Sequence, residues 1–178
     1  MNLIELKISG AFEIKLPFSE DDRGDFVKIL HADSFREHGL EPGFRESYYS
    51  TSRAGVIRGM HFQSPPHDHE KLVYCVEGKV LDVLLDLRAD SQTFQQYCTV
   101  QLAKDARNAV YIPRGVAHGF CVQEGSASLV YMTTTVYDKE SDTGVLWNSF
   151  GFDWPVDNPL ISERDTGFEA LNSFQSPF

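Results

Sequence analysis

The sequence feature that most constrains the fold is the alternation in residues 80–87, which read VLDVLLDL. One set of alternate positions is entirely apolar and comprises Leu81, Val83, Leu85 and Leu87. The other set carries two carboxylates, Asp82 and Asp86, between apolar residues. A period of two places successive side chains on opposite sides of an extended chain. We therefore predict a β-strand here, with at least one face packed in a core.

The rest of the chain also favours strands over helices. Residues 128–137, SLVYMTTTVY, are rich in the β-branched and aromatic residues that strands prefer. Turn signals separate such runs, at RAG (53–55), EG (77–78), RG (114–115), EG (124–125) and DTG (142–144). Many short strands at this spacing predict an all-β sandwich or closed barrel.

One short helix is predicted over residues 33–38, outside the strand-rich region. Ser34 and Glu37 have the spacing of a capping box, and Gly39 can end the helix in the left-handed region. With 178 residues and no linker, the chain is expected to form one domain. We place the barrel core at about 45–140, N-terminal strands and the helix at 1–44, and a C-terminal wrap at 141–178, aperiodic after Trp154.

Composition excludes several classes of function. The net charge is −10, whereas broad nucleic-acid binding requires a large basic surface. No window approaches the ~20 apolar residues of a membrane span, and the start, MNLIE, does not resemble a secretory signal. The three cysteines are odd in number and include no C-x-x-C pair, which favours reduced thiols in the cytoplasm.

Two polar segments resemble the halves of the cupin barrel motif. Residues 113–118 read PxGxxH, and an HxH at 67–69 is followed by Gly78. In metal-binding cupins a glutamate stands where this chain has Lys71, and an ammonium group cannot donate a lone pair to a cation. We therefore expect a cupin-like jelly-roll β-barrel with a few short peripheral helices, and neither metal nor cofactor.

Five segments taken together, from about Phe12 to Asp165, closely resemble the dTDP-4-dehydrorhamnose 3,5-epimerase family. In chain order they are DRG (22–24), VIRGMHFQ (56–63), KLV (71–73), DVLLDLR (82–88) and IPRGVAHGF (112–120). The resemblance implies epimerisation at C3, C5 or both of a nucleotide-linked 4-keto-6-deoxy sugar. In this reaction a base removes a proton next to the ketone, an enolate forms, and an acid returns a proton to the opposite face.

The resemblance also assigns the catalytic roles. His61 falls on the base, and histidine titrates near neutral pH without perturbation. Asp165 would orient that imidazole, Lys71 would stabilise the enolate oxygen, and Tyr131 falls on the proton donor. Strict alternation would put Arg58 and His61 on opposite faces of one strand. We therefore predict a bulge between them at Gly59.

The remaining expected site residues bind substrate. Arg23 and Arg58 would hold the diphosphate, where a guanidinium suits two anionic oxygens, and His118 would contact the sugar or support the site. The other expected binding residues are Lys28, Glu46, Tyr48, Asp142 and Arg164.

Three departures from the family pattern involve binding positions. Lys28 stands where the family usually has Glu, ESYYS (46–50) replaces QDNHS, and Arg164 replaces Lys. The departures leave open a GDP- or CDP-linked substrate, although a dTDP-sugar is the first choice, and inversion of only one carbon.

The alternative of another class is a metal-dependent cupin oxygenase or isomerase using His67, His69 and His118. A sugar-binding cupin without catalysis would not need base, acid and enolate stabiliser together. In the epimerase interpretation, His67 and His69 are exposed loop residues. Family members are homodimers, and the alternation of Phe12, Ile14 and Leu16 suits a strand added to a partner.

Overall fold

The computed structural model describes all residues, 1–178, and consists of thirteen strands and two short helices. The strands are β1 (Asn2–Glu5), β2 (Phe12–Lys15), β3 (Phe18–Asp21), β4 (Gly24–Val27), β5 (Glu46–Arg53), β6 (Ile57–Gln63), β7 (Lys71–Glu77), β8 (Lys79–Asp86), β9 (Tyr97–Ala103), β10 (Asn108–Ile112), β11 (Val116–Cys121), β12 (Ser126–Thr133) and β13 (Asp142–Gly144). The helices are α1 (Ala32–Glu37) and α2 (Glu163–Thr166), and neither has the length and apolar character needed to cross a bilayer.

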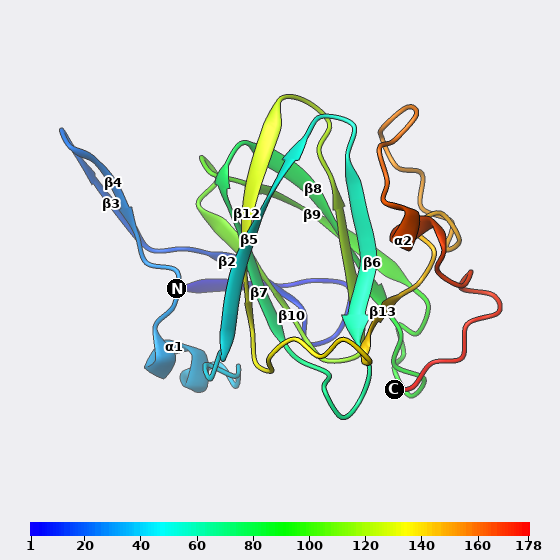
Figure 1. The fold of residues 1–178 in the computed structure, drawn as a ribbon. Helices are drawn as coiled ribbons and strands as arrows, with labels where there is room; N and C mark the ends of the chain where they lie inside the picture. The colour runs from blue at the N-terminus through cyan, green and yellow to red at the C-terminus, as the bar shows by residue number, and fades with distance from the viewer.

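Two facing sheets form the barrel (Figure 1). The first has six strands in the order β1-β2-β10-β7-β12-β5, and the second has five in the order β13-β6-β11-β8-β9. The predicted cupin-like jelly roll is confirmed. The alternation in residues 80–87 has its expected meaning: Val80 and Leu84 lie in the core between the sheets, while Val83 and Leu85 pack in a second core on the outer face of the five-stranded sheet.

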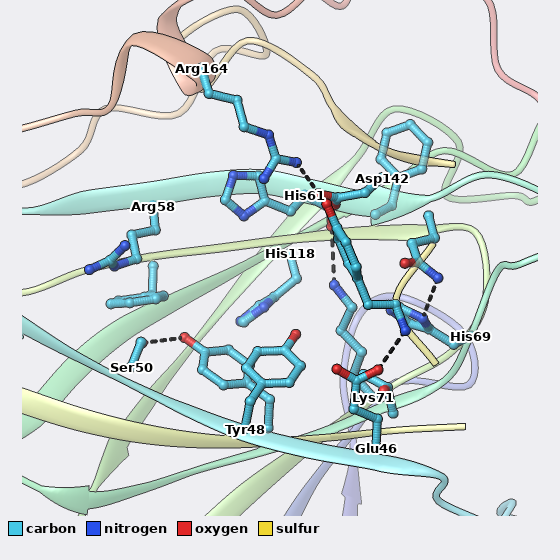
Figure 2. A pocket seen from close by; sticks show the side chains of 16 residues that line it. Glu46, Tyr48, Ser50, Arg58, His61, His69, Lys71, His118, Asp142 and Arg164 are labelled. Carbon is cyan, nitrogen blue, oxygen red and sulfur yellow. Dashed lines mark hydrogen bonds and ion pairs between the residues drawn. The ribbon is translucent and has the colours of Figure 1, made fainter. Parts of the chain in front are cut away.

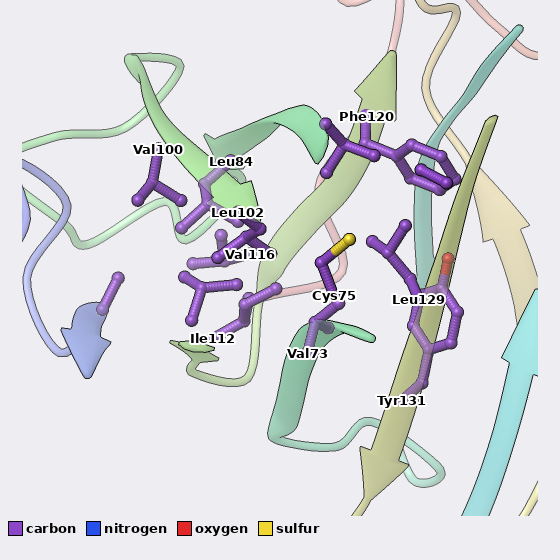
Figure 3. Packing of buried hydrophobic residues seen from close by; sticks show 14 of the residues in the cluster. Val73, Cys75, Leu84, Val100, Leu102, Ile112, Val116, Phe120, Leu129 and Tyr131 are labelled. Carbon is purple, nitrogen blue, oxygen red and sulfur yellow. The ribbon is translucent and has the colours of Figure 1, made fainter. Parts of the chain in front are cut away.

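Three apolar clusters hold these layers together. The largest fills part of the barrel interior and includes Val73, Leu84 and Leu129 (Figure 3). A second covers the outer face of the five-stranded sheet, where Leu171 and Phe178 from the C-terminal segment pack. A third joins α1 to the six-stranded sheet. The tail after Trp154 therefore packs on the outside of the barrel, and it carries α2 to the end of the cavity described below.

The β3–β4 hairpin stands away from the barrel (Figure 1). Phe26 is 65% exposed there, and Phe18 is also exposed. Arg107 forms ion pairs with Glu20 and Asp25, which face each other close to the turn of the hairpin. The hairpin thus leaves Phe26 and the side chain of Arg23 largely exposed in its own chain.

Three local predictions were wrong in detail. The strand predicted over residues 128–137 ends at Thr133. This residue is opposite Glu46 and Lys71, the first residues of β5 and β7, so β12 has no partner beyond it, and the hydroxyl of Thr134 bonds Glu70 instead. The turn predicted at residues 142–144 is β13, which pairs with β6. The predicted capping box does not form, because the chain is already helical at Ala32 and the side chain of His31 is the N-cap.

Candidate active site

Alternate residues of three neighbouring strands face one cavity inside the barrel. Strand pairing puts Glu46, Thr133 and Lys71 in one row across the six-stranded sheet, and Tyr48 beside Tyr131 in the next. Neighbours in such rows project from the same face of a sheet. The opposite wall comes from the five-stranded sheet, and the cavity has a volume of about 350 Å³ (Figure 2).

Nine of the twelve expected site residues line this cavity. They are Glu46, Tyr48, Arg58, His61, Lys71, His118, Tyr131, Asp142 and Arg164. Asp165 lies directly behind His61. Arg23 and Lys28 do not line the cavity of their own chain: Arg23 sits on the β3–β4 hairpin paired with Asp21, and Lys28 follows β4.

A bulge in β6 brings Arg58 and His61 to the same cavity, as predicted. His118 pairs with His61 and Phe120 with Arg58, so two steps along β11 match three along β6. Gly59 has a φ of +143°, and a Cβ there would lie 2.6 Å from the Cα of Gly119. Only glycine satisfies both conditions.

The first chemical unit is a dyad of His61 and Asp165. The Nε2 atom of His61 lies 2.8 Å from Oδ1 of Asp165, whose Oδ2 accepts a hydrogen bond from the backbone N–H of Gly59. Because the carboxylate can only accept, Nε2 carries the proton, which leaves Nδ1 as the basic nitrogen. The Oγ of Ser162 caps α2 and so fixes the position of Asp165.

Electrostatics keep this dyad ready to act as a base. Burial lowers the pKa of His61. The hydrogen bond and the charge of Asp165 raise this pKa in part, whereas the nearby charges of Lys71 and Arg164 lower it further. Burial alone would raise the pKa of Asp165, but its hydrogen bonds to His61 and Gly59 outweigh burial and hold the pKa below its usual range. At neutral pH the imidazole is therefore neutral and the carboxylate charged.

Lys71 is the buried cation of the cavity. Its Nζ lies 3.4 Å from the backbone oxygen of His61, and burial lowers its pKa to about 8 although Asp142 and Asp82 favour the charged form. The ammonium therefore remains mainly charged at pH 7. A fixed positive charge in a site shielded from water is well suited to stabilise a developing oxyanion.

Tyr131 faces the dyad from the other sheet. Its hydroxyl lies 3.0 Å from the Oγ of Ser50, and burial raises its pKa well above the ordinary value. The phenol therefore stays protonated at neutral pH and can donate a proton. Base and acid thus come from opposite walls of one cavity.

A second buried pair, His118 and Asp82, was not assigned a joint role from sequence. The Nε2 of His118 is 2.7 Å from Oδ2 of Asp82, and Oδ1 of Asp82 has no partner. Burial raises the pKa of Asp82, while His118 and Lys71 oppose that shift. The signal in the sequence that could have identified this pair is Asp82 itself, a carboxylate between apolar residues of a predicted strand.

The prediction that His69 is an exposed loop residue was wrong. His69 lies two residues before Lys71 and lines the cavity, where burial lowers its pKa to about 3. Its Nδ1 contacts the Oγ1 of Thr135, and its Nε2 has no partner. His67 remains on a loop with its side chain 45% exposed, and His67, His69 and His118 do not form a group that could hold a metal ion.

Other site residues missed from sequence are Ser50, Gln63, Thr133 and Tyr137, which all line the cavity. Their inward direction depends on strand register and on the loop after β12, neither of which a single sequence specifies. Towards the rim, Arg164 forms a 2.9 Å ion pair with Asp142, and the backbone N–H of Tyr137 donates to Glu46.

The chain is similar to known proteins along most of its length. The family model for dTDP-4-dehydrorhamnose 3,5-epimerase matches residues 5–173. A dTDP-4-dehydrorhamnose 3,5-epimerase from Shigella flexneri is 38% identical over 168 residues, 93% of each chain. A dTDP-4-dehydrorhamnose 3-epimerase from Streptomyces niveus is also 38% identical, over 93% of this chain and 81% of that one.

A solved structure extends the similarity to three dimensions. The dTDP-6-deoxy-D-glucose-3,5-epimerase from Legionella pneumophila Philadelphia 1, in complex with dTDP-4-keto-L-rhamnose, is 32% identical with a TM-score of 0.93. The alignment covers 98% of this chain and 94% of that one.

Proposed function

Because the chain belongs to the dTDP-4-dehydrorhamnose 3,5-epimerase family, we propose that it inverts C3 and C5 of dTDP-4-dehydro-6-deoxyglucose to give dTDP-4-dehydrorhamnose. The observation that carries this proposal is the placement of a neutral histidine and a protonated tyrosine on opposite walls, with a buried ammonium in the same cavity. Inversion at carbon requires a proton to leave one face and return to the other.

The inversion that Tyr131 completes proceeds in two proton transfers. Nδ1 of His61 takes the proton from the carbon next to the ketone, and the C–H electron pair forms the enolate, whose negative oxygen faces Lys71. Asp165 stabilises the resulting imidazolium through Nε2. The hydroxyl of Tyr131 then gives its proton to the carbon, and the enolate pair forms the new C–H bond. His61 releases its proton to solvent, and Tyr131 recovers one.

The pH dependence follows from these states. Activity should fall as pH decreases through the lowered pKa of His61, below about 6.5, because the base becomes protonated. It should also fall as pH rises through about 8, because Lys71 loses its charge. A profile of kcat/KM against pH checks both limbs. In Lys71→Arg the limb near pH 8 should disappear, while Lys79→Arg, an exposed control, should keep it; an unchanged limb in Lys71→Arg would assign it to another group.

The nucleotide is proposed from the relatives and from the basic groups at the cavity. Arg58 and Arg164 supply two guanidinium groups there, which suits a diphosphate. Glu46 and Tyr48 depart from the family pattern at the same cavity, and the Streptomyces niveus relative is a 3-epimerase, so a GDP- or CDP-linked sugar and inversion at C3 alone are the alternatives. Comparing kcat/KM for the dTDP-, GDP- and CDP-linked 4-keto-6-deoxy sugars tests the proposal. A higher kcat/KM for the GDP- or CDP-linked sugar would identify that sugar, and not the dTDP-linked one, as the preferred substrate.

We also propose that the protein is a homodimer. The β3–β4 hairpin projects from the barrel with Phe26 65% exposed and the side chain of Arg23 89% exposed. Neither Arg23 nor Lys28 reaches the cavity of its own chain, and a partner's cavity would give both of them an anionic ligand. The three free thiols fit a reducing compartment such as the cytoplasm.

Sedimentation at micromolar concentration should therefore give the mass of a dimer. Arg23→Ala should raise KM more than it lowers kcat, because it removes a diphosphate contact and not a catalytic group. Arg36→Ala, which breaks an ion pair on α1, is the control and should change neither constant. A monomer with full activity would contradict the proposal.

A further inference from the structure

Two phenol rings lie stacked in the cavity. Tyr48 on β5 pairs directly with Tyr131 on β12, and the ring centroids are 4.8 Å apart with an interplanar angle of 15°. Both residues line the cavity from the sheet opposite the one that carries His61, and Tyr48 is labelled in Figure 2. Sequence reasoning named Tyr48 only as a residue that binds substrate.

The two hydroxyl groups have different surroundings. That of Tyr131 is fixed on Ser50, and the residue is only 7% exposed. The hydroxyl of Tyr48 takes no part in this contact and forms no hydrogen bond to another protein group, and Tyr48 is 45% exposed. Burial, followed by the charges of Glu46 and Asp142, raises the pKa of Tyr48 to about 12, so this phenol also stays protonated at neutral pH.

A double epimerisation needs two protons on the wall opposite the base, one for each carbon that flanks the ketone. Tyr131 is held on Ser50, and Tyr48 adds a second phenol beside it, at a position where the family usually has Asn. We propose that Tyr48 is a second proton donor, which reprotonates one of the two carbons while Tyr131 reprotonates the other. This inference rests on the proposed 3,5-epimerase function.

The step balances in the same way at either carbon. The phenol O–H bond breaks, its proton goes to carbon, and the electron pair of the enolate double bond becomes the new C–H bond. The phenolate of Tyr48 then takes a proton from water, which its exposure allows, whereas that of Tyr131 recovers one through the hydroxyl of Ser50.

The test separates the two carbons. Tyr48→Phe keeps the stacked ring and removes only the hydroxyl, and the adjacent Tyr49→Phe, 74% exposed outside the cavity, is the matched control. Each variant is incubated in D2O with dTDP-4-dehydro-6-deoxyglucose, and NMR follows deuterium and configuration at C3 and C5 separately. We expect Tyr48→Phe to slow inversion at one carbon by ~10²-fold while exchange continues there, and Tyr131→Phe to slow it at the other.

Three results would overturn the two-donor proposal. Inversion at both carbons at the wild-type rate in Tyr48→Phe would show that its hydroxyl is not a donor. Equal slowing at both carbons would indicate a positioning role. Wild-type inversion of a single carbon would remove the need for a second donor. If the wild-type protein exchanged neither carbon, the proposed function itself would fail, and the two-donor proposal would fail with it.

Discussion

Replacing His61 with alanine is expected to lower kcat by ~10²–10⁴ and to stop deuterium entering C3 or C5 from D2O. The reason is that Nδ1 of His61 is the basic nitrogen aligned by Asp165, and its bulged strand position holds it in the cavity. His118 forms a similar pair with the buried Asp82 in the same cavity, so deuterium exchange that persisted in His61→Ala would point to His118 as the base. Initial rates and NMR of the reaction in D2O measure both effects.

The control for this change is His67→Ala, which removes an imidazole from a loop outside the cavity and should retain activity. Tyr131→Phe offers a second comparison, because exchange should continue when the base is present and inversion is impaired. Deuterium exchange at the wild-type rate in His61→Ala would show that another group is the base.

Replacing Lys71 with methionine should reduce kcat/KM by ~10²–10³, the range observed when one group that stabilises an oxyanion is removed. Methionine has similar length without the charge, so the enolate oxygen loses its buried cation. The fold should survive: the pKa of Lys71 is lowered to about 8, which means that the folded protein opposes charging of this side chain. Steady-state kinetics and a thermal melt measure the two effects.

Lys79→Met serves as the matched control, because Lys79 is an exposed lysine paired with Glu124 at the far end of β7 and β8. It should leave kcat/KM unchanged. If Lys71→Met melts like the wild type and retains full kcat/KM, the ammonium does not stabilise the enolate.

What the sequence predicts well is local and periodic. The alternation in residues 80–87 correctly predicts a strand with a packed face, and the structure places Val80 and Leu84 of that strand inside the barrel. The bulge at Gly59 follows because two polar side chains three residues apart must reach one cavity. The first inference needs only the geometry of one strand, and the second adds the roles that the family resemblance gives to Arg58 and His61.

What the sequence misses depends on contacts between distant segments. Asp165 and His61 are 104 residues apart and meet only because the tail wraps the five-stranded sheet; a family resemblance, not periodicity, named Asp165. The stacking of Tyr48 on Tyr131 requires the register of β5 against β12. The mistaken assignment of His69 has the same origin, because a segment before β7 that reads as a loop lies against the residues after β12.

Incubation of the wild-type protein with dTDP-4-dehydro-6-deoxyglucose in D2O is the most direct measurement of the reaction. Deuterium is counted at each carbon by NMR as the sugar changes configuration. We expect one deuterium at C3 and one at C5 in dTDP-4-dehydrorhamnose, because both returning protons come from groups that exchange with solvent. A folded protein that leaves the substrate unchanged and free of deuterium at both carbons would contradict the assignment of His61, Lys71 and Tyr131 to this chemistry.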